Sequence, residues 1–180
     1  MSLPHAILSI LITCPSSGYA LAKRFNPSVE GSVGFFWSAS FQQIYRELSR
    51  LEEKEWLQAK SIQQEHRPDK RIYSVTALGK QQLCNWIAES EEMTPIKDDL
   101  FIKLYVGHLV PKTVIVAKLT EHRLQHQQRL AIYTEIKQQY FQTPQDLPQP
   151  IKFQYLTLLR GIHFEMGWLA WFDEIIPFLK

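Results

Sequence analysis

Residues 38–51, SASFQQIYRELSRL, carry the pattern that decides the fold of this chain. Apolar side chains return every three or four residues, as on one face of an α-helix, and Ser38 or Ser40 can cap the first turn. The apolar stripe consists of Phe41, Ile44, Leu48 and Leu51. The opposite face is polar and consists of Gln42, Gln43, Arg46, Ser49 and Arg50. Such side chains can contact the bases and phosphates of DNA, although they also solvate any ordinary helix.

Two shorter helices are predicted before this segment. Apolar side chains recur at helical spacing over residues 4–13, and a Pro-Ser-Ser-Gly run then ends the pattern. Ser17 is suited to cap a second helix over residues 19–25. The stretch 26–36 contains glycines and a proline, which predicts a loop before the third helix.

A β-hairpin and a fourth helix are predicted after it. Residues 56–65 and 71–76 have the pattern of short strands, and the polar segment 66–70 between them has the composition of a turn. Thr76 can cap a helix that continues through Ile87. Three helices, a hairpin and a further helix, in this order, predict a winged helix.

Composition and charge indicate a globular protein with a basic N-terminal half. The 180 residues are 45% hydrophobic, enough for a core, and no apolar run could cross a bilayer. We therefore expect a cytoplasmic protein without a membrane segment. Cys14 and Cys84 are far apart and lack metal-ligand spacing, which argues against a disulfide framework or a zinc site. Residues 1–88 contain ten Lys and Arg against seven Asp and Glu, a net charge of +3, whereas residues 89–180 contain ten against eleven.

A second, helical domain is predicted in the C-terminal half. The acidic segment 88–95 lacks an apolar period, which suggests domains over residues 1–90 and 95–180. The predicted elements are a short helix over residues 97–109, a long helix from 112 to about 141, a loop over 142–150 and a final helical stretch over 151–179. The final stretch is apolar on more than one side, so it requires partners on several faces.

We therefore expect this half to form an antiparallel, coiled-coil-like homodimer. The residues expected to make the dimer are Ile115, Leu119, Leu130, Tyr133, Leu156, Leu159, Trp168 and Trp171.

Several motifs resemble those of a known family. In the N-terminal half they are Gly18-Tyr19, Phe36-Trp37, Gln43-Ile44-Tyr45 with Leu48 and Leu51, and the hairpin residues Pro68, Lys70-Arg71, Tyr73, Thr76 and Gly79. They are similar to the motifs of PadR-family winged-helix transcription regulators. The opening residues 1–5, the block 42–48 and Leu156–Arg160 with Trp168 and Trp171 resemble the AphA-type virulence activators of that family. The resemblance implies a homodimeric, DNA-binding activator or repressor.

The chain departs from this family's pattern after the third helix. The family usually has glycine where this chain has Glu55. If that residue has a left-handed backbone, the glutamate costs up to about 1 kcal/mol relative to glycine. The loop 26–36 is also longer than usual.

Candidate DNA contacts divide into base readout and phosphate binding. The residues expected to read bases in the major groove are Gln42, Gln43 and Arg46, because glutamine can pair with adenine and arginine with guanine. Those expected to bind phosphates are Lys23, Ser38, Ser40, Tyr45 and Arg50. Those expected to reach the neighbouring backbone or minor groove from the hairpin are Arg67, Lys70 and Arg71. The target would be double-stranded promoter DNA, with a pseudo-palindromic site.

Other functions fit the sequence less well. His122 and His126 could ligate a metal, but no neighbouring ligand completes a known motif, and neither a nucleophile motif nor a phosphate loop is present. We expect neither an enzyme nor a cofactor. Trp37, Trp86, Trp168 and Trp171 could line a pocket for a small aromatic effector, although core or dimer packing is the more common role of such residues. The alternative to a DNA-binding regulator is a protein-interaction module with a degenerate winged helix.

Overall fold

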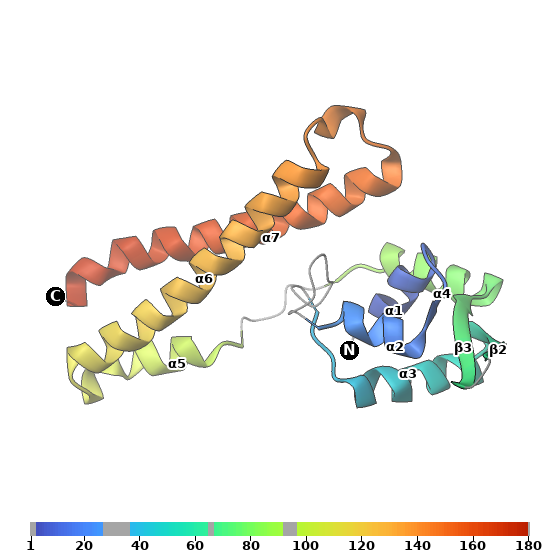
Figure 1. Cartoon of the computed structure of the whole chain (residues 1–180). Helices are drawn as coiled ribbons and strands as arrows, with labels where there is room; N and C mark the ends of the chain where they lie inside the picture. Colours follow the sequence, from blue (N-terminus) through green and yellow to red (C-terminus); the bar gives the residue numbers. More distant parts are fainter. Residues whose placement is uncertain (1–2, 27–36, 65–66, 92–96, 180) are drawn as a thin grey trace. The chain divides into compact units, whose positions relative to one another are not determined.

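A computed structural model of the chain describes residues 3–26, 37–64, 67–91 and 97–179 (Figure 1). They belong to two compact units, Met1–Met93 and Thr94–Lys180. The chain is mainly helical with one small antiparallel sheet, which confirms the predicted fold class. The predicted loop 26–36, except Asn26, and residues 65–66 of the predicted hairpin lie outside the described residues.

The N-terminal unit has the helices that the periodicity predicts. They are α1 (Leu3–Leu11), α2 (Gly18–Arg24), α3 (Phe41–Glu53) and α4 (Ala77–Ala88). The expected caps are confirmed, because Ser17 accepts a hydrogen bond from the Ala20 N–H at 3.3 Å and Thr76 accepts one from the Gly79 N–H at 3.0 Å. Each side chain thereby satisfies an N–H that the first helical turn leaves unpaired.

The core of this unit lies between α1, α2 and the inner face of α3. Ile44, Leu48 and Leu51 of α3 are 0% exposed, as are Ile7 and Leu8 of α1. The predicted stripe is therefore buried, with one exception. The prediction for Phe41 was wrong, because this first residue of α3 lies beyond the core and is 42% exposed.

The sheet contains one more strand than predicted. Its strands are β1 (Ser16–Ser17), β2 (Leu57–Gln64) and β3 (Arg67–Val75), in the order β1-β3-β2. The β1 strand pairs antiparallel with Ile72 and Tyr73, through two residues that have no strand pattern of their own. The sheet therefore ties the segment before α2 to the hairpin.

The hairpin connection was placed incorrectly, because β3 begins at Arg67 and most of the predicted turn 66–70 is strand. Ile62 pairs with Lys70 and Gln64 with Arg67, so β3 has an extra residue between these two pairs. Pro68 lies in this bulge. A bulge can hold a proline inside a strand, because the unpaired residue gives no N–H to the ladder.

A tight turn after α3 leads into β2 and also contacts the start of α4. Its backbone closes with two hydrogen bonds of 2.9 Å, from Glu55 N–H to Glu52 O and from Trp56 N–H to Leu51 O. Glu55 has φ 60°, so the condition for strain at this position, a left-handed backbone, is met. Its carbonyl oxygen accepts a hydrogen bond from the Thr76 hydroxyl at 2.6 Å. At Gly79 a Cβ would lie 2.1 Å from the Trp56 carbonyl oxygen, so only glycine lets α4 pack this close to the turn.

The C-terminal unit is a helical hairpin with a short helix beside it (Figure 1). Its elements are α5 (Asp99–Tyr105), η2 (Gly107–Leu109), α6 (Lys112–Tyr140), η3 (Pro144–Asp146), α7 (Gln149–Ile175) and η4 (Ile176–Leu179). The long helices α6 and α7 pack antiparallel along their length. Leu100 of α5 joins Leu119 of α6 and Phe172 of α7 in one buried cluster.

The turn after α3 predicts a stabilising substitution. We expect Glu55→Gly to raise the free energy of unfolding by about 1 kcal/mol, because glycine adopts a positive φ without strain. Glu55→Ala is the matched control, since it removes the carboxylate and keeps the strain, and it should give no such gain. Urea unfolding followed by circular dichroism measures both. Equal stability of the glycine and alanine variants would contradict the prediction.

Candidate nucleic-acid interface

The exposed face of α3 presents two unpaired polar side chains in its first two turns. Gln42 and Arg46 are exposed and four residues apart, so they project from the same side of the helix. Among the described residues, neither forms a hydrogen bond or an ion pair with another side chain. Both are free to bind an external ligand, and they are the best-placed of the predicted base-reading residues.

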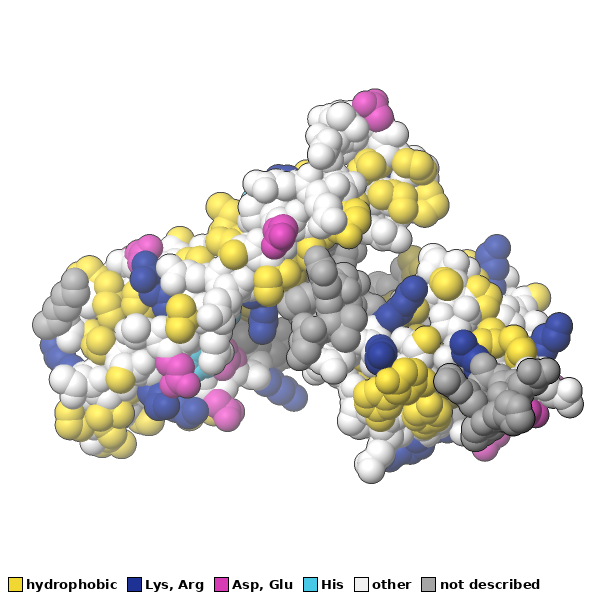
Figure 2. Space-filling view, in the orientation of Figure 1, with side chains coloured by type: hydrophobic (Ala, Val, Ile, Leu, Met, Phe, Trp, Pro, Cys, Tyr) yellow, Lys and Arg dark blue, Asp and Glu magenta, His cyan; other side chains and the backbone are white. Residues whose placement is uncertain are grey.

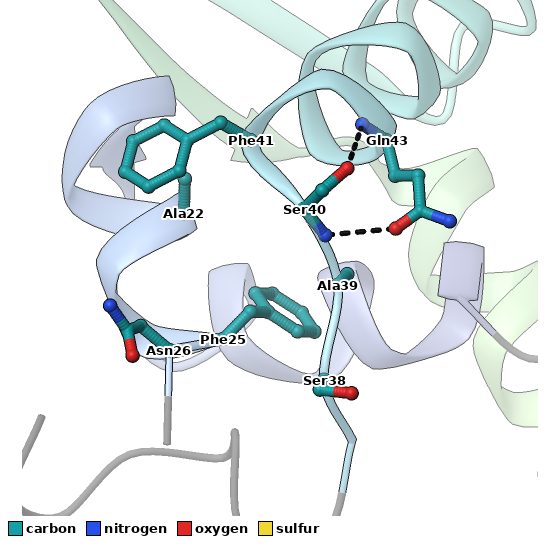
Figure 3. Close-up of a pocket in the computed structure, with 8 residues that line it drawn as sticks. All are labelled: Ala22, Phe25, Asn26, Ser38, Ala39, Ser40, Phe41 and Gln43. Atoms are coloured by element: carbon teal, nitrogen blue, oxygen red, sulfur yellow. Dashed lines mark hydrogen bonds between the residues drawn. The ribbon is translucent and has the colours of Figure 1, made fainter. Parts of the chain in front are cut away.

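The start of α3 is fixed by a reciprocal pair of hydrogen bonds (Figure 3). The Ser40 hydroxyl oxygen accepts from the Gln43 N–H at 3.2 Å, and the Gln43 side-chain oxygen accepts from the Ser40 N–H at 2.8 Å. This capping box gives Gln43 a structural role that the sequence analysis did not assign. A bidentate pair between Gln43 and adenine would require its oxygen to leave the cap.

Two arginines of the predicted interface have acidic partners. Arg50 pairs with Glu47 of the same helix at 3.2 Å. Arg71 of β3 pairs with Glu52 of α3 through contacts of 2.6 and 2.9 Å. The second pair holds β3 against the last turn of α3, so Arg71 orients the hairpin besides adding charge. Lys70 is exposed and unpaired among the described residues, whereas the side chain of Arg67 lies outside them.

Helix α2 packs closely against α3 through its first residue. A Cβ on Gly18 would lie 2.8 Å from Cε1 of Tyr45, so the absence of a side chain there lets the Tyr45 ring approach α2. Lys23 of α2 lies over the Tyr19 ring, with 4.8 Å between its Nζ and the ring centroid. Because the Tyr19 ring lies beside Phe41, the first residue of α3, Lys23 is near the start of that helix. Arg71, which pairs with Glu52, is near its end. Ser38, one residue before Ala39 and the cap, is exposed.

Two exposed aromatic residues that are not among the predicted DNA contacts also lie on this surface. Tyr19 is 57% exposed and Phe41 is 42% exposed, and their ring centroids are 6.0 Å apart. Figure 3 shows Phe41 projecting from the start of α3 toward Ala22 of α2. Phe41 lies in the first turn of α3, one turn before Ile44, the first buried residue of the stripe. This position is the sequence feature that could have indicated its exposure.

The predicted dimer residues divide into buried and exposed sets. Leu119 and Tyr133 are 0% and 2% exposed, so they pack inside their own helical hairpin rather than against a partner. Burial raises the pKa of the Tyr133 phenol above its usual range. Leu156 of α7 is 54% exposed and free to pack against another molecule. The partly buried members of the set are Ile115, Leu130, Leu159, Trp168 and Trp171.

A buried charge cluster lies between α6 and α7. Glu165 is 2% exposed, and its carboxylate contacts Nδ1 of His126 and, at 3.6 Å, a guanidinium nitrogen of Arg129. The His126 ring also stacks on Trp168, with 4.0 Å between the centroids. His126 therefore pairs with a carboxylate, and among the described residues no three potential ligands come together to hold a metal.

The tryptophans considered for an effector pocket lie in different surroundings. Trp168 and Trp171 line a cavity of about 180 Å³ in the C-terminal unit, together with Phe164 and four other residues. Trp86 of the N-terminal unit instead stacks on His5, with 4.3 Å between the ring centroids.

Known protein families match both halves of the chain. Residues 7–85 match the family described as transcriptional regulator PadR-like, and residues 96–180 match the virulence activator alpha C-terminal family. A probable transcriptional regulator of Mycobacterium tuberculosis is 35% identical to the chain over 190 residues, which cover 100% of this chain and 98% of that protein. Within the described residues, no helix is long and apolar enough to span a membrane.

Solved structures of similar proteins have the same fold. Bacillus subtilis PadR in complex with operator DNA gives a TM-score of 0.85 at 24% identity and covers 100% of both chains. The same protein in complex with p-coumaric acid gives a TM-score of 0.78 at 24% identity, covering 99% of both chains. The Vibrio cholerae virulence activator AphA gives 0.77 at 29% identity, covering 99% of this chain and 98% of that one.

The capping box predicts that Ser40 stabilises the N-terminal unit. We expect Ser40→Ala to lower the free energy of unfolding by about 1 kcal/mol, because the Gln43 N–H loses its acceptor. Ser38→Ala is the control, since the Ser38 side chain forms no hydrogen bond among the described residues. Thermal and urea unfolding of the full chain compare the two. If both variants unfold at the same urea concentration, the cap does not contribute as proposed.

Proposed function

The chain belongs to the PadR-like family of transcriptional regulators, and we propose that it regulates transcription as a homodimer that binds pseudo-palindromic promoter DNA. The observation that carries this proposal is the pair of exposed side chains, Gln42 and Arg46, that have no partner on α3 among the described residues. The inner residues of α3 are completely buried, so Gln42 and Arg46 are held outward on a rigid element. A helix of this diameter fits the major groove of B-DNA.

Base readout is assigned to Gln42 and Arg46 on the exposed face of α3. Arg46 can donate two hydrogen bonds to guanine, and Gln42 can pair with adenine. Because neither side chain has to leave an internal partner, binding does not break an existing interaction. Gln43 is a weaker candidate, since its oxygen serves the helix cap.

Phosphate binding is assigned to cations at both ends of α3. Lys23 lies beside Tyr19 near the start of the helix, and Lys70 and Arg71 lie on β3 near its end. These side chains would neutralise phosphates on either side of the groove and supply affinity without sequence preference. Ser38, Ser40, Tyr45, Arg50 and Arg67 remain predicted phosphate contacts.

The homodimer is assigned to the second apolar face of α7. One face packs on α6 through Leu158, Ile162 and Phe172, which are 5%, 8% and 6% exposed. The opposite side carries Phe153 and Leu156, which are 66% and 54% exposed. A Cβ on Gly167, on this same side, would meet no atom within 4 Å. A second copy seated there would cover apolar surface that the chain cannot cover by itself.

This function requires neither catalysis nor a cofactor, and we place it in the cytoplasm together with the DNA target. An aromatic effector remains a prediction, supported by the Trp168–Trp171 cavity and by the complex of Bacillus subtilis PadR with p-coumaric acid. The protein-interaction alternative has less support, because a degenerate winged helix has no need of unpaired Gln42 and Arg46 on its outer face.

DNA binding is tested with the promoter fragment beside the chain's own gene, by fluorescence anisotropy at several salt concentrations. We expect Arg46→Ala to weaken binding by about 1–3 kcal/mol and to relax the preference at one base position. Lys70→Ala is the contrasting variant. It should weaken binding to all sequences about equally and reduce the salt dependence by about one phosphate contact. Absence of binding to any genomic fragment would favour the protein-interaction alternative.

The dimer is tested by a charge placed on the exposed face of α7. We expect Leu156→Glu to shift the protein from dimer to monomer at micromolar concentration in sedimentation velocity, because the carboxylate would be buried without a partner. Leu124→Glu on α6 is the matched control, since Leu124 is 56% exposed and lies off this face. A wild-type protein that sediments as a monomer would refute the assignment.

A further inference from the structure

Three aromatic side chains form an exposed patch on the N-terminal unit, which we call the aromatic patch: Tyr19, Phe41 and Tyr45. They are 57%, 42% and 45% exposed. Tyr19 and Phe41 lie with their ring centroids 6.0 Å apart, and Tyr45 is one helical turn after Phe41 on α3. The Tyr45 ring also lies against Gly18, the residue before Tyr19. The patch therefore spans the junction of α2 and α3.

The aromatic patch does not belong to the core of its unit. The buried cluster is built from α1, α2, α3, the sheet and α4, and none of the three aromatic residues is part of it or packs against it as a partly buried member. Three large rings thus remain half in water, at a cost in hydration free energy. Adjacent exposed apolar side chains of this kind are a feature of binding sites.

Polar and cationic groups surround the patch. Lys23 lies over the Tyr19 ring, and Gln42 and Arg46 directly follow Phe41 and Tyr45 along α3. Figure 2 shows hydrophobic side chains gathered over the α3 region of this unit, with lysine and arginine side chains around them. An apolar surface flanked by Lys23 and Arg46 is complementary to a ligand that is anionic at its edges and has an apolar group between them.

The major groove of DNA has this character. Its walls are phosphates, and its base edges present hydrogen-bonding groups with a single apolar exception, the C5-methyl group of thymine. We propose that the aromatic patch, led by Phe41, recognises thymine methyl groups and thereby adds sequence preference beyond the hydrogen bonds of Gln42 and Arg46. The inference rests on the proposed function, because it requires α3 to enter the major groove.

The position of Phe41 supports this role. It is the first residue of α3, and the N-terminal residues of a recognition helix are those that contact base edges. The capping box at Ser40 and Gln43 holds the backbone on either side of it, and its ring leans toward Ala22 of α2 (Figure 3). The ring is therefore positioned before DNA arrives.

The test replaces thymine by deoxyuridine, which removes the methyl group and keeps every hydrogen-bonding atom of the base. The probe is a duplex selected from random DNA by the purified full-length protein, with single replacements at each thymine. We expect wild-type affinity to fall about fourfold at one or more thymines in each half-site, the equivalent of one buried methylene. Replacements outside the bound site serve as the DNA control.

Protein variants assign the effect to the patch. Phe41→Ala should bind the thymine and deoxyuridine duplexes with equal affinity, whereas Phe41→Leu, which keeps an apolar side chain, should retain part of the difference. Tyr19→Ala is a second variant if Phe41→Ala does not fold, as judged by its melting curve. Ile87→Ala on α4 removes an equally apolar side chain that is 69% exposed, and it should leave the difference unchanged.

The outcomes separate this inference from the proposed function. If the wild type selects DNA but binds every deoxyuridine duplex as tightly as the thymine duplex, the patch does not read methyl groups, and DNA binding stands. Retention of the full difference in folded variants of both Phe41 and Tyr19 would also overturn the inference. If the protein selects no DNA, the proposed function itself fails, and the patch then fits the surface of another protein.

Discussion

The burial of one side of α3 is the constraint on which the rest of the structure depends. Ile44, Leu48 and Leu51 are 0% exposed, and each contributes roughly 1.5–3 kcal/mol of hydrophobic stabilisation. Exposed ion pairs such as Arg50 with Glu47 contribute at most about 1 kcal/mol. Packing therefore decides which way the helix faces, and the outward direction of Gln42 and Arg46 follows from it. Rotating α3 to bury Arg46 would also expose its apolar stripe.

Local backbone interactions then fix the two ends of this helix. The capping box sets its first turn, and the left-handed Glu55 ends it, so that β2 starts at once. The Thr76 hydroxyl bonds to the Glu55 carbonyl and also caps α4, which joins the turn to a second helix. The close contact of Gly79 with Trp56 completes this junction. The hairpin with Lys70 and Arg71 is thereby held beside the same helix that carries the base-reading side chains.

The C-terminal unit consists mainly of two long helices, of which α7 is more apolar than α6. The α6 helix has a polar middle, and there His126 and Arg129 meet the buried Glu165 of α7. Removing one partner of a buried charged group costs free energy of folding, because the remaining charge is left without a partner. The cluster therefore favours a single register between the two helices. On the side of α7 that faces away from α6, Phe153 and Leu156 stay exposed among the described residues. The C-terminal unit therefore has its own core between α6 and α7 and a separate apolar surface on α7 for assembly.

The sequence by itself determined the helices of the N-terminal unit, the caps at Ser17 and Thr76 and the outward face of α3, because these depend on spacing within a few residues of chain. It also pointed to Glu55 as a position that would be strained if its backbone were left-handed, and to the final helical stretch 151–179 as one that needs partners. Only the tertiary structure decided which apolar residues of the C-terminal unit are buried. Leu119 and Leu156 have the same local pattern, yet Leu119 is buried and Leu156 is exposed. The tertiary structure also decided the strand β1, the early start of β3, the pairing of Arg71 with Glu52 and the exposure of Phe41. Each depends on residues distant in the chain, and a periodic pattern shows that a side chain needs a neighbour without showing which neighbour it has.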